Sequence, residues 1–187
     1  KENIIETVYQ GHKDICEKVL FDKSDLKPLS RKSEASNVTY EFFSSLYRTR
    51  FFNEKNIRFL PITYGEDTYV CFKYLLLSQV AVTSTKTVYS HRRNPTSTTF
   101  QYHNSYLEET KKYYDFYLGL FKDFATEYLS QAAAGLDAQY LRRCFSAIER
   151  ELFMSPKDRS VSKKIETIKS VRKDNKFRQM FTFKNLK

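Results

Sequence analysis

The chain has 187 residues, of which 41% are hydrophobic, and a formal net charge of +10. This length and composition are typical of a globular protein with a buried core. No apolar run approaches the ~20 residues that span a bilayer, and no charged and then apolar leader opens the sequence. We therefore expect a soluble protein of the cytoplasm.

Cysteine and histidine are few and widely spaced. Cys16, Cys71 and Cys144 lack the paired spacing of a zinc or redox site, and their odd number fits a reducing compartment. The three histidines also show no ligand spacing. We expect no metal site built by this chain.

The first part of the chain, to about residue 100, predicts helices mixed with a few short strands. Apolar spacing indicates one helix over 3–10 and another over 12–21. The polar stretch 22–37, with one proline and four serines, is typical of a loop. We interpret 38–53 as an extended start followed by a short helix.

Two adjacent carboxylates, Glu66 and Asp67, are the best clue to chemistry in the sequence. Gly65 lets the backbone turn before them, and short polar side chains suit the start of a helix. Apolar residues within 70–77 would dock that helix in a core and hold both carboxylates at the lip of a cleft. A carboxylate held in a fixed position is suited to act as a general base. The alternative is that acidic residues in a first helical turn only complement the helix dipole.

These carboxylates belong to an ordered set of short elements between residues 38 and 100. The set comprises Leu46-Tyr47-Arg48, Phe51-Phe52, Phe59, Gly65-Glu66-Asp67, Tyr89, His91, Arg92, Ser97 and Thr99. In this order it resembles the acceptor-side half of family 2 glycosyltransferases. Members of that family show a Leu-Tyr-Arg element, a Glu-Asp pair that opens a helix, a Tyr-x-Tyr-Arg run and a Ser-x-Thr. The second tyrosine of that run is His91 here, a departure that leaves the role of this position open.

The resemblance implies a GT-A fold and the transfer of a sugar, with inversion, from a nucleotide-sugar donor to a hydroxyl of a glycan or lipid-linked acceptor. The Asp of the Glu-Asp pair is the family's general base, which places that role on Asp67. Glu66 would then orient the acceptor or the loop. A guanidinium can bind phosphate oxygens through two parallel hydrogen bonds, although a solvated arginine pair at a strand end is an equal alternative. The candidates for binding the acceptor or the donor diphosphate are Tyr89, His91, Arg92 and Arg93.

Two features of the family are missing from this sequence. Members hold a divalent cation, Mg or Mn, through an Asp-x-Asp motif that bridges the donor diphosphate, and this chain has no Asp-x-Asp. Its four glycines are isolated, so it has no glycine-rich phosphate loop either. We expect the chain to be the C-terminal portion of a longer enzyme whose nucleotide-binding half precedes it, and we expect the fragment alone to be inactive.

From residue 101 onward the sequence predicts helices throughout. Helices are expected over 106–129, 138–153, 162–173 and 175–183. The fold class is therefore α+β and helix-rich, a partial GT-A acceptor-side region followed by an all-helical region. We expect 1–100 to be the acceptor-side part of the catalytic domain and 101–187 to be a helical C-terminal domain.

The C-terminal tail carries most of the net charge. Residues 156–187 hold eleven Lys or Arg against three acids, so +8 of the formal +10 lies there. On a helix, four apolar residues of this tail share one face: Val161, Ile165, Ile168 and Val171. A basic amphipathic helix is typical of peripheral contact with anionic lipid, and we expect 157–187 to touch the inner face of the cell membrane. The alternative is that the apolar face packs on the preceding helix and the lysines are solvated.

Two other functional classes stay open. A basic helical chain is also compatible with a nucleic-acid-binding module. The tail lacks a helix-turn-helix signature, zinc spacing and an aromatic RNA-binding motif, so we expect no nucleic-acid partner. The other class is a non-catalytic accessory or oligomerisation domain of a polysaccharide system, and a homo-oligomer is compatible with either enzyme or accessory domain.

Overall fold

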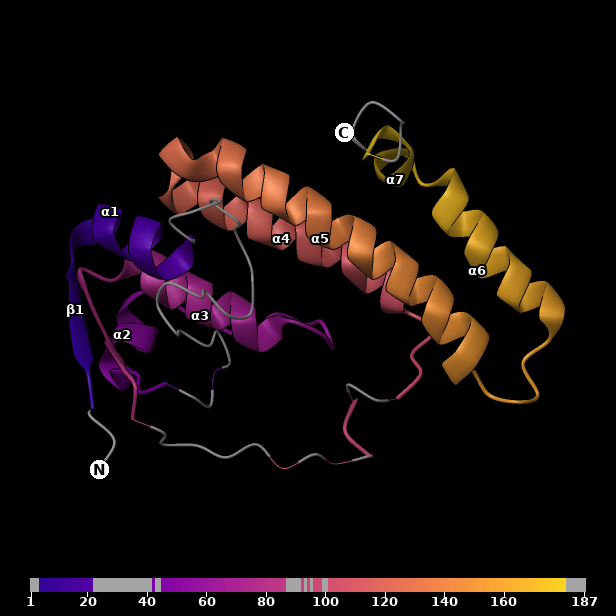
Figure 1. Ribbon diagram of the computed structural model, residues 1–187, viewed down its shortest axis with the longest axis horizontal. Helices are drawn as coiled ribbons and strands as arrows, with labels where there is room; N and C mark the ends of the chain where they lie inside the picture. The colour runs from indigo at the N-terminus through magenta and orange to yellow at the C-terminus, as the bar shows by residue number, and fades with distance from the viewer. Residues whose placement is uncertain are drawn as a thin grey trace.

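Helices predominate in the protein, and a small antiparallel sheet accompanies them, which confirms the expected helix-rich α+β class (Figure 1). The computed structural model describes residues 4–21, 42, 45–86, 92, 94, 96–98 and 101–180. The sheet and the helices that precede residue 80 lie at one end of the molecule, and the long helices that follow extend away from them (Figure 1).

The sheet pairs two strands that are far apart in the sequence. Strand β1 (Glu6–Gln10) runs antiparallel to β2 (Val80–Ser84), with Val8 opposite Val82 and Tyr9 opposite Ala81. The predicted helix over 3–10 is therefore wrong. The segment contains β-branched and aromatic residues that suit a strand, and its hydrogen-bonding partner lies too far along the chain for local apolar spacing to reveal it.

The two faces of the sheet differ in burial. Tyr9 is buried and packs with Ile15 and Val19 of the following helix. On the opposite face, three valines are more than half exposed. Their exposed fractions are 55% for Val8, 57% for Val80 and 59% for Val82.

Short helices follow the first strand. Helix α1 (Gly11–Ile15) continues without a break into the π-helical turn η1 (Cys16–Leu20), which confirms the helix predicted over 12–21. Helix α2 (Thr49–Glu54) corresponds to the short helix expected near the end of 38–53. The extended start of that stretch, before residue 42, and the loop predicted over 22–37 lie outside the described residues.

Helix α3 (Glu66–Leu77) begins at the carboxylate pair, as predicted. Val70, Phe72 and Leu76 on this helix are buried in the main core. The helix packs against the long helix that follows it in the chain.

Two long antiparallel helices form the body of the molecule. Helix α4 (Tyr106–Phe124) ends earlier than the predicted 106–129, because Ala125 leaves the helical conformation at φ −154° and a 3-10 turn, η4 (Thr126–Tyr128), follows. Helix α5 (Leu129–Glu149) then begins well before the predicted residue 138. Its first turns are rich in alanine, which gives little apolar periodicity, yet Ala132 is fully buried where α5 packs on α4.

The chain then turns back on itself. The π-helical turn η5 (Arg150–Met154) extends α5, and helix α6 (Val161–Lys173) returns along it, followed by α7 (Asn175–Met180) (Figure 1). The side chain of Ser160 caps α6 by accepting a hydrogen bond from Lys163 N. Both helices match the predictions of 162–173 and 175–183, except that residues beyond 180 lie outside the described part of the chain.

One hydrophobic core joins the regions before and after residue 100. Phe21 and Phe72 from the first region share it with Phe121, Leu136 and Val171 from the second. All three cysteines are buried free thiols.

Candidate functional site

Gly65 fixes the turn that leads into the carboxylate pair. Its φ of +93° lies in the left-handed region, which favours glycine. Its carbonyl oxygen accepts hydrogen bonds from Tyr117 Oη at 2.9 Å and from Tyr69 N at 2.9 Å. A Cβ atom at this position would lie 2.6 Å from Tyr113 Cε2. The backbone is therefore pressed onto α4 at a point where no side chain fits.

Glu109 of α4 holds the loop that precedes this turn. Its carboxylate accepts hydrogen bonds from Thr63 N and Thr63 Oγ1, each at 2.9 Å, and from Ser105 Oγ at 2.9 Å. The chain that leads into α3 is thus anchored at Thr63 and at Gly65. This is the rigid support that a functional carboxylate needs.

Glu66 and Asp67 are both half-buried at the first turn of α3. Asp67 Oδ1 accepts a hydrogen bond from Thr68 N at 2.7 Å. Within the described part of the chain, no Lys, Arg or His forms an ion pair with either carboxylate. Burial raises the pKa of Glu66, and the negative charges of Asp67 and Glu109 raise it further. Glu66 consequently holds its proton more strongly than an ordinary glutamate.

Aromatic side chains lie beside this carboxylate pair. Tyr47 Oη lies 2.9 Å from Cys71 Sγ on α3, and the Tyr47 ring stacks on Phe42 with centroids 4.7 Å apart. Burial, the Cys71 thiol and, more weakly, the charge of Asp67 raise the pKa of Tyr47. The structure therefore brings the predicted Leu-Tyr-Arg element to the same helix as the Glu-Asp pair, with Arg48 N donating to Tyr74 Oη at 3.0 Å.

Of the four predicted binding residues that follow β2, the structure describes only one. Tyr89, His91 and Arg93 lie outside the described residues, and Arg92 is exposed. The end of this segment returns to the loop before α3, because Tyr64 Oη donates a hydrogen bond to Thr98 O at 2.9 Å.

Two arginines lie near this site, Arg143 on α5 and Arg150 at the start of η5, and neither was among the residues predicted from the sequence. The guanidinium of Arg143 lies over the Tyr113 ring, 3.8 Å from its centroid, and its Nη2 would be 3.3 Å from a Cβ at Gly65. Arg150 Nη1 lies 3.3 Å from Tyr64 Oη. Nothing in the local sequence points to them, because helix pairing brings them to α3 from a region expected to be separate.

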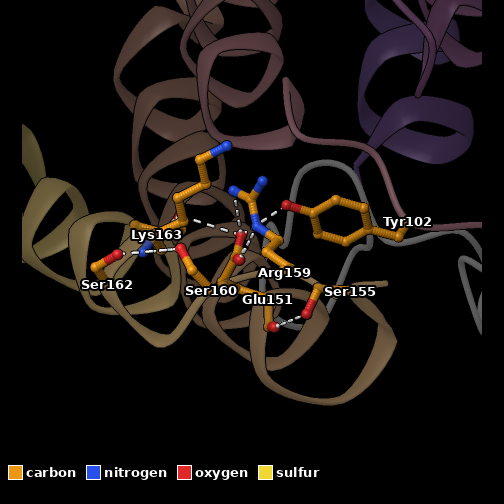
Figure 2. Close-up of polar contacts among 8 residues, drawn as sticks. Tyr102, Glu151, Ser155, Arg159, Ser160, Ser162 and Lys163 are labelled. Carbon is orange, nitrogen blue, oxygen red and sulfur yellow. Dashed lines mark hydrogen bonds and ion pairs between the residues drawn. The ribbon is translucent and has the colours of Figure 1, made fainter. Parts of the chain in front are cut away.

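A second polar cluster lies at the far end of α5, around a buried carboxylate (Figure 2). Glu151 is 2% exposed and forms an ion pair with Arg159. Its Oε2 also accepts hydrogen bonds from Tyr102 Oη at 2.7 Å and Thr167 Oγ1 at 3.1 Å. Burial acts to raise the pKa of Glu151, but the hydrogen bonds from Arg159, Tyr102 and Thr167 outweigh it and lower the pKa. Through Glu151, the cluster links the end of the α5 helix to Tyr102 before α4, to Arg159 before α6 and to Thr167 within α6.

An open hollow of about 490 Å³ lies beside this second cluster. Its lining includes Tyr102, His103, Arg159 and Lys163, and none of its lining residues comes from α3. The hollow is therefore separate from Glu66 and Asp67.

The residues described here do not fit a divalent-cation site. No group of three or more His, Cys, Asp or Glu side chains in the described residues is arranged to hold a metal ion. Glu66, Asp67 and Glu109 influence one another electrostatically without forming such a group. Among the described residues we therefore find no ligand set for the cation that the family resemblance implies.

Comparison of the chain with protein-family models, with curated proteins and with solved structures finds no match. In the described part of the chain, no helix has both the length and the apolar character needed to cross a membrane.

Proposed function

We propose that this chain is the acceptor-side, C-terminal part of a longer inverting glycosyltransferase. The enzyme would transfer a sugar from a nucleotide-sugar donor to a hydroxyl of a surface polysaccharide or glycoconjugate. The observation that carries the proposal is the half-buried Glu66–Asp67 pair, which stands at the start of α3 on a backbone anchored through Gly65 and Glu109.

In this proposal Asp67 is the general base. The acceptor oxygen forms a bond to the anomeric carbon while its proton passes to the Asp67 carboxylate. The bond from the anomeric carbon to the donor phosphate oxygen breaks, and the nucleoside diphosphate leaves with the electron pair. Glu66, with its raised pKa, orients an acceptor hydroxyl by hydrogen bonding. Tyr89, His91, Arg92 and Arg93 stay candidates for contacts with the acceptor or the diphosphate.

The exposed face of the sheet supports the proposal that another part of the enzyme packs on this chain. Val8, Val80 and Val82 lie on one face and are all more than half exposed, whereas the other face is packed. A nucleotide-binding half placed there would bury this face. That half would also supply the ligands for Mg or Mn, because the Asp-x-Asp motif of the family is missing from this sequence. The proton transfer to Asp67 does not depend on the cation.

We place the enzyme in the cytoplasm, where nucleotide-sugar donors are available. The three buried free thiols are consistent with a reducing compartment.

The test is an Asp67→Asn substitution in the enzyme that contains both halves. We expect the turnover number to fall by about 10²–10⁴-fold, because the proton acceptor is lost. Donor affinity, measured by calorimetry, should change little. The matched control is Asp123→Asn, which removes an exposed carboxylate from the far end of α4 and should leave turnover intact. Wild-type turnover in Asp67→Asn would refute the assignment.

A further inference from the structure

Three flat side chains from α4 and α5 are stacked beside the turn at Gly65. The Arg143 guanidinium lies over the Tyr113 ring, with its Cζ 3.8 Å from the ring centroid. The Tyr113 ring in turn stacks on Tyr117, with centroids 4.1 Å apart and ring planes 26° apart. Tyr113 is 5% exposed and Tyr117 is fully buried, whereas Arg143 is half-buried. We call these three residues the arginine-tyrosine stack.

The stack contacts the backbone of Gly65 at two points. Tyr117 Oη donates a hydrogen bond to Gly65 O at 2.9 Å. A Cβ atom at Gly65 would lie 2.6 Å from Tyr113 Cε2 and 3.3 Å from Arg143 Nη2, so the ring and the guanidinium both lie close to this residue. Asp67 follows Gly65 by two residues, and a shift of the Gly65 backbone would therefore move its carboxylate.

Aromatic faces, and not acids, hold Arg143 in this place. In the described part of the chain, no carboxylate forms an ion pair with Arg143. A guanidinium is attracted to the negative face of a tyrosine ring, and its planar shape covers that face. Burial and the neighbouring Tyr113 raise the pKa of Tyr117, while the charge of Arg143 opposes this rise and the charge of Asp67 adds to it. Both charges thus act on the hydroxyl that holds the Gly65 carbonyl.

We propose that Arg143 is a positioning residue for Asp67. By covering the Tyr113 ring, Arg143 keeps the stack and the Gly65 turn in place, so that the Asp67 carboxylate meets the acceptor hydroxyl. This inference rests on the proposed role of Asp67 as the general base. A base takes a proton only within hydrogen-bond reach, and a displacement of about 1 Å is sufficient to slow the reaction strongly.

The first test uses the enzyme that contains both halves. Arg143→Met keeps a long unbranched side chain but removes the guanidinium, and we expect the turnover number to fall about tenfold. The KM for the acceptor and the affinity for the donor should change little, because Arg143 acts through Tyr113 and not on the substrate. Arg143→Lys keeps a cation above the ring and should recover part of the turnover. The matched control is Arg142→Met, at the adjacent exposed position of α5, which should leave turnover intact.

Hydrogen exchange in the present chain tests the positioning without turnover. Tyr69 N donates to Gly65 O at 2.9 Å, so the exchange of this amide reports whether the carbonyl stays in place. We expect the Tyr69 amide to exchange about tenfold faster in Arg143→Met than in the parent. The control is the amide of Gly11, which donates to Gln79 O beyond the other end of α3 and should exchange at an unchanged rate.

Three results would overturn the inference. They are wild-type turnover in Arg143→Met, an equal loss of turnover in Arg142→Met, and an unchanged exchange rate of the Tyr69 amide. A rise in the acceptor KM at unchanged turnover would also overturn it, because that result would place Arg143 in contact with the substrate. Wild-type turnover in Asp67→Asn would instead remove the general base itself, and the positioning role with it. An inactive Asp67→Asn together with a fully active Arg143→Met would overturn the positioning role alone.

Discussion

Two carboxylates of this protein, Glu66 and Glu151, lie in opposite environments. Glu151 is almost fully buried, and the Arg159 guanidinium and two hydroxyls satisfy it, so its pKa is lowered. Glu66 is half-buried at a helix start beside two other carboxylates, so its pKa is raised. A carboxylate whose oxygens all have partners within the protein, as in Glu151, stabilises the fold. A carboxylate that lies near like charges, as in Glu66, is destabilised when it is ionised, and a proton or a hydrogen bond from a substrate hydroxyl would lower its free energy.

The largest effect on stability should come from Gly65→Ala, which tests how firmly the start of α3 is held. Alanine is strained at φ +93°, and its Cβ would overlap the Tyr113 ring. We expect the free energy of unfolding to fall by about 3–4 kcal/mol, the sum of a left-handed backbone cost and overpacking. Urea denaturation measures it. Gly119→Ala is the control, because a Cβ there meets nothing within 4 Å, and it should be neutral or slightly stabilising. Equal effects of the two variants would contradict a tightly packed turn.

The next largest effect should come from Glu151→Gln. This change leaves the Arg159 guanidinium without its carboxylate, and we expect a loss of about 3 kcal/mol at neutral pH. Because the folded-state pKa of Glu151 is lowered, its contribution is present above the ordinary pKa of glutamate and is lost as the pH falls through the folded-state value. Urea denaturation at several pH values should therefore show the difference between variant and parent shrinking in acid. A difference that is independent of pH would rule out the ion pair as its cause.

The smallest effect should come from Glu66→Gln, and it should have the opposite sign. The raised pKa means that ionised Glu66 opposes folding, so the glutamine variant should be the more stable protein at neutral pH. The gain should disappear as the pH falls below the ordinary pKa of glutamate, where both folded and unfolded parent are protonated. Glu149→Gln, at an exposed position of α5, is the control and should show no such trend. Loss of stability in Glu66→Gln at neutral pH would contradict the raised pKa.

The sequence predicted correctly those elements whose signals lie within a few neighbouring residues. A turn glycine, two acidic residues and the apolar run behind them were sufficient to predict the start of α3 at Glu66. The strand β1 was missed because its partner β2 lies far along the chain. Arg143 was missed because only the packing of α5 on α4 brings it to the turn at Gly65. Glu151 did give a signal, since it follows Tyr140, Cys144 and Ala147 at helical spacing on the buried face. A charged residue on such a face requires a buried partner.

The buried cysteines have a practical consequence for spectroscopy. Burial raises the pKa of Cys16 to about 12, with help from the charges of Glu127 and Glu17, and burial likewise raises the pKa of Cys144 to about 12. Thiols in this state contain very little thiolate at neutral pH and react slowly with maleimides. A cysteine introduced at an exposed site such as Phe153 would therefore accept a polarity-sensitive dye much faster than these two native thiols, and the wavelength of its emission would report the polarity around that site.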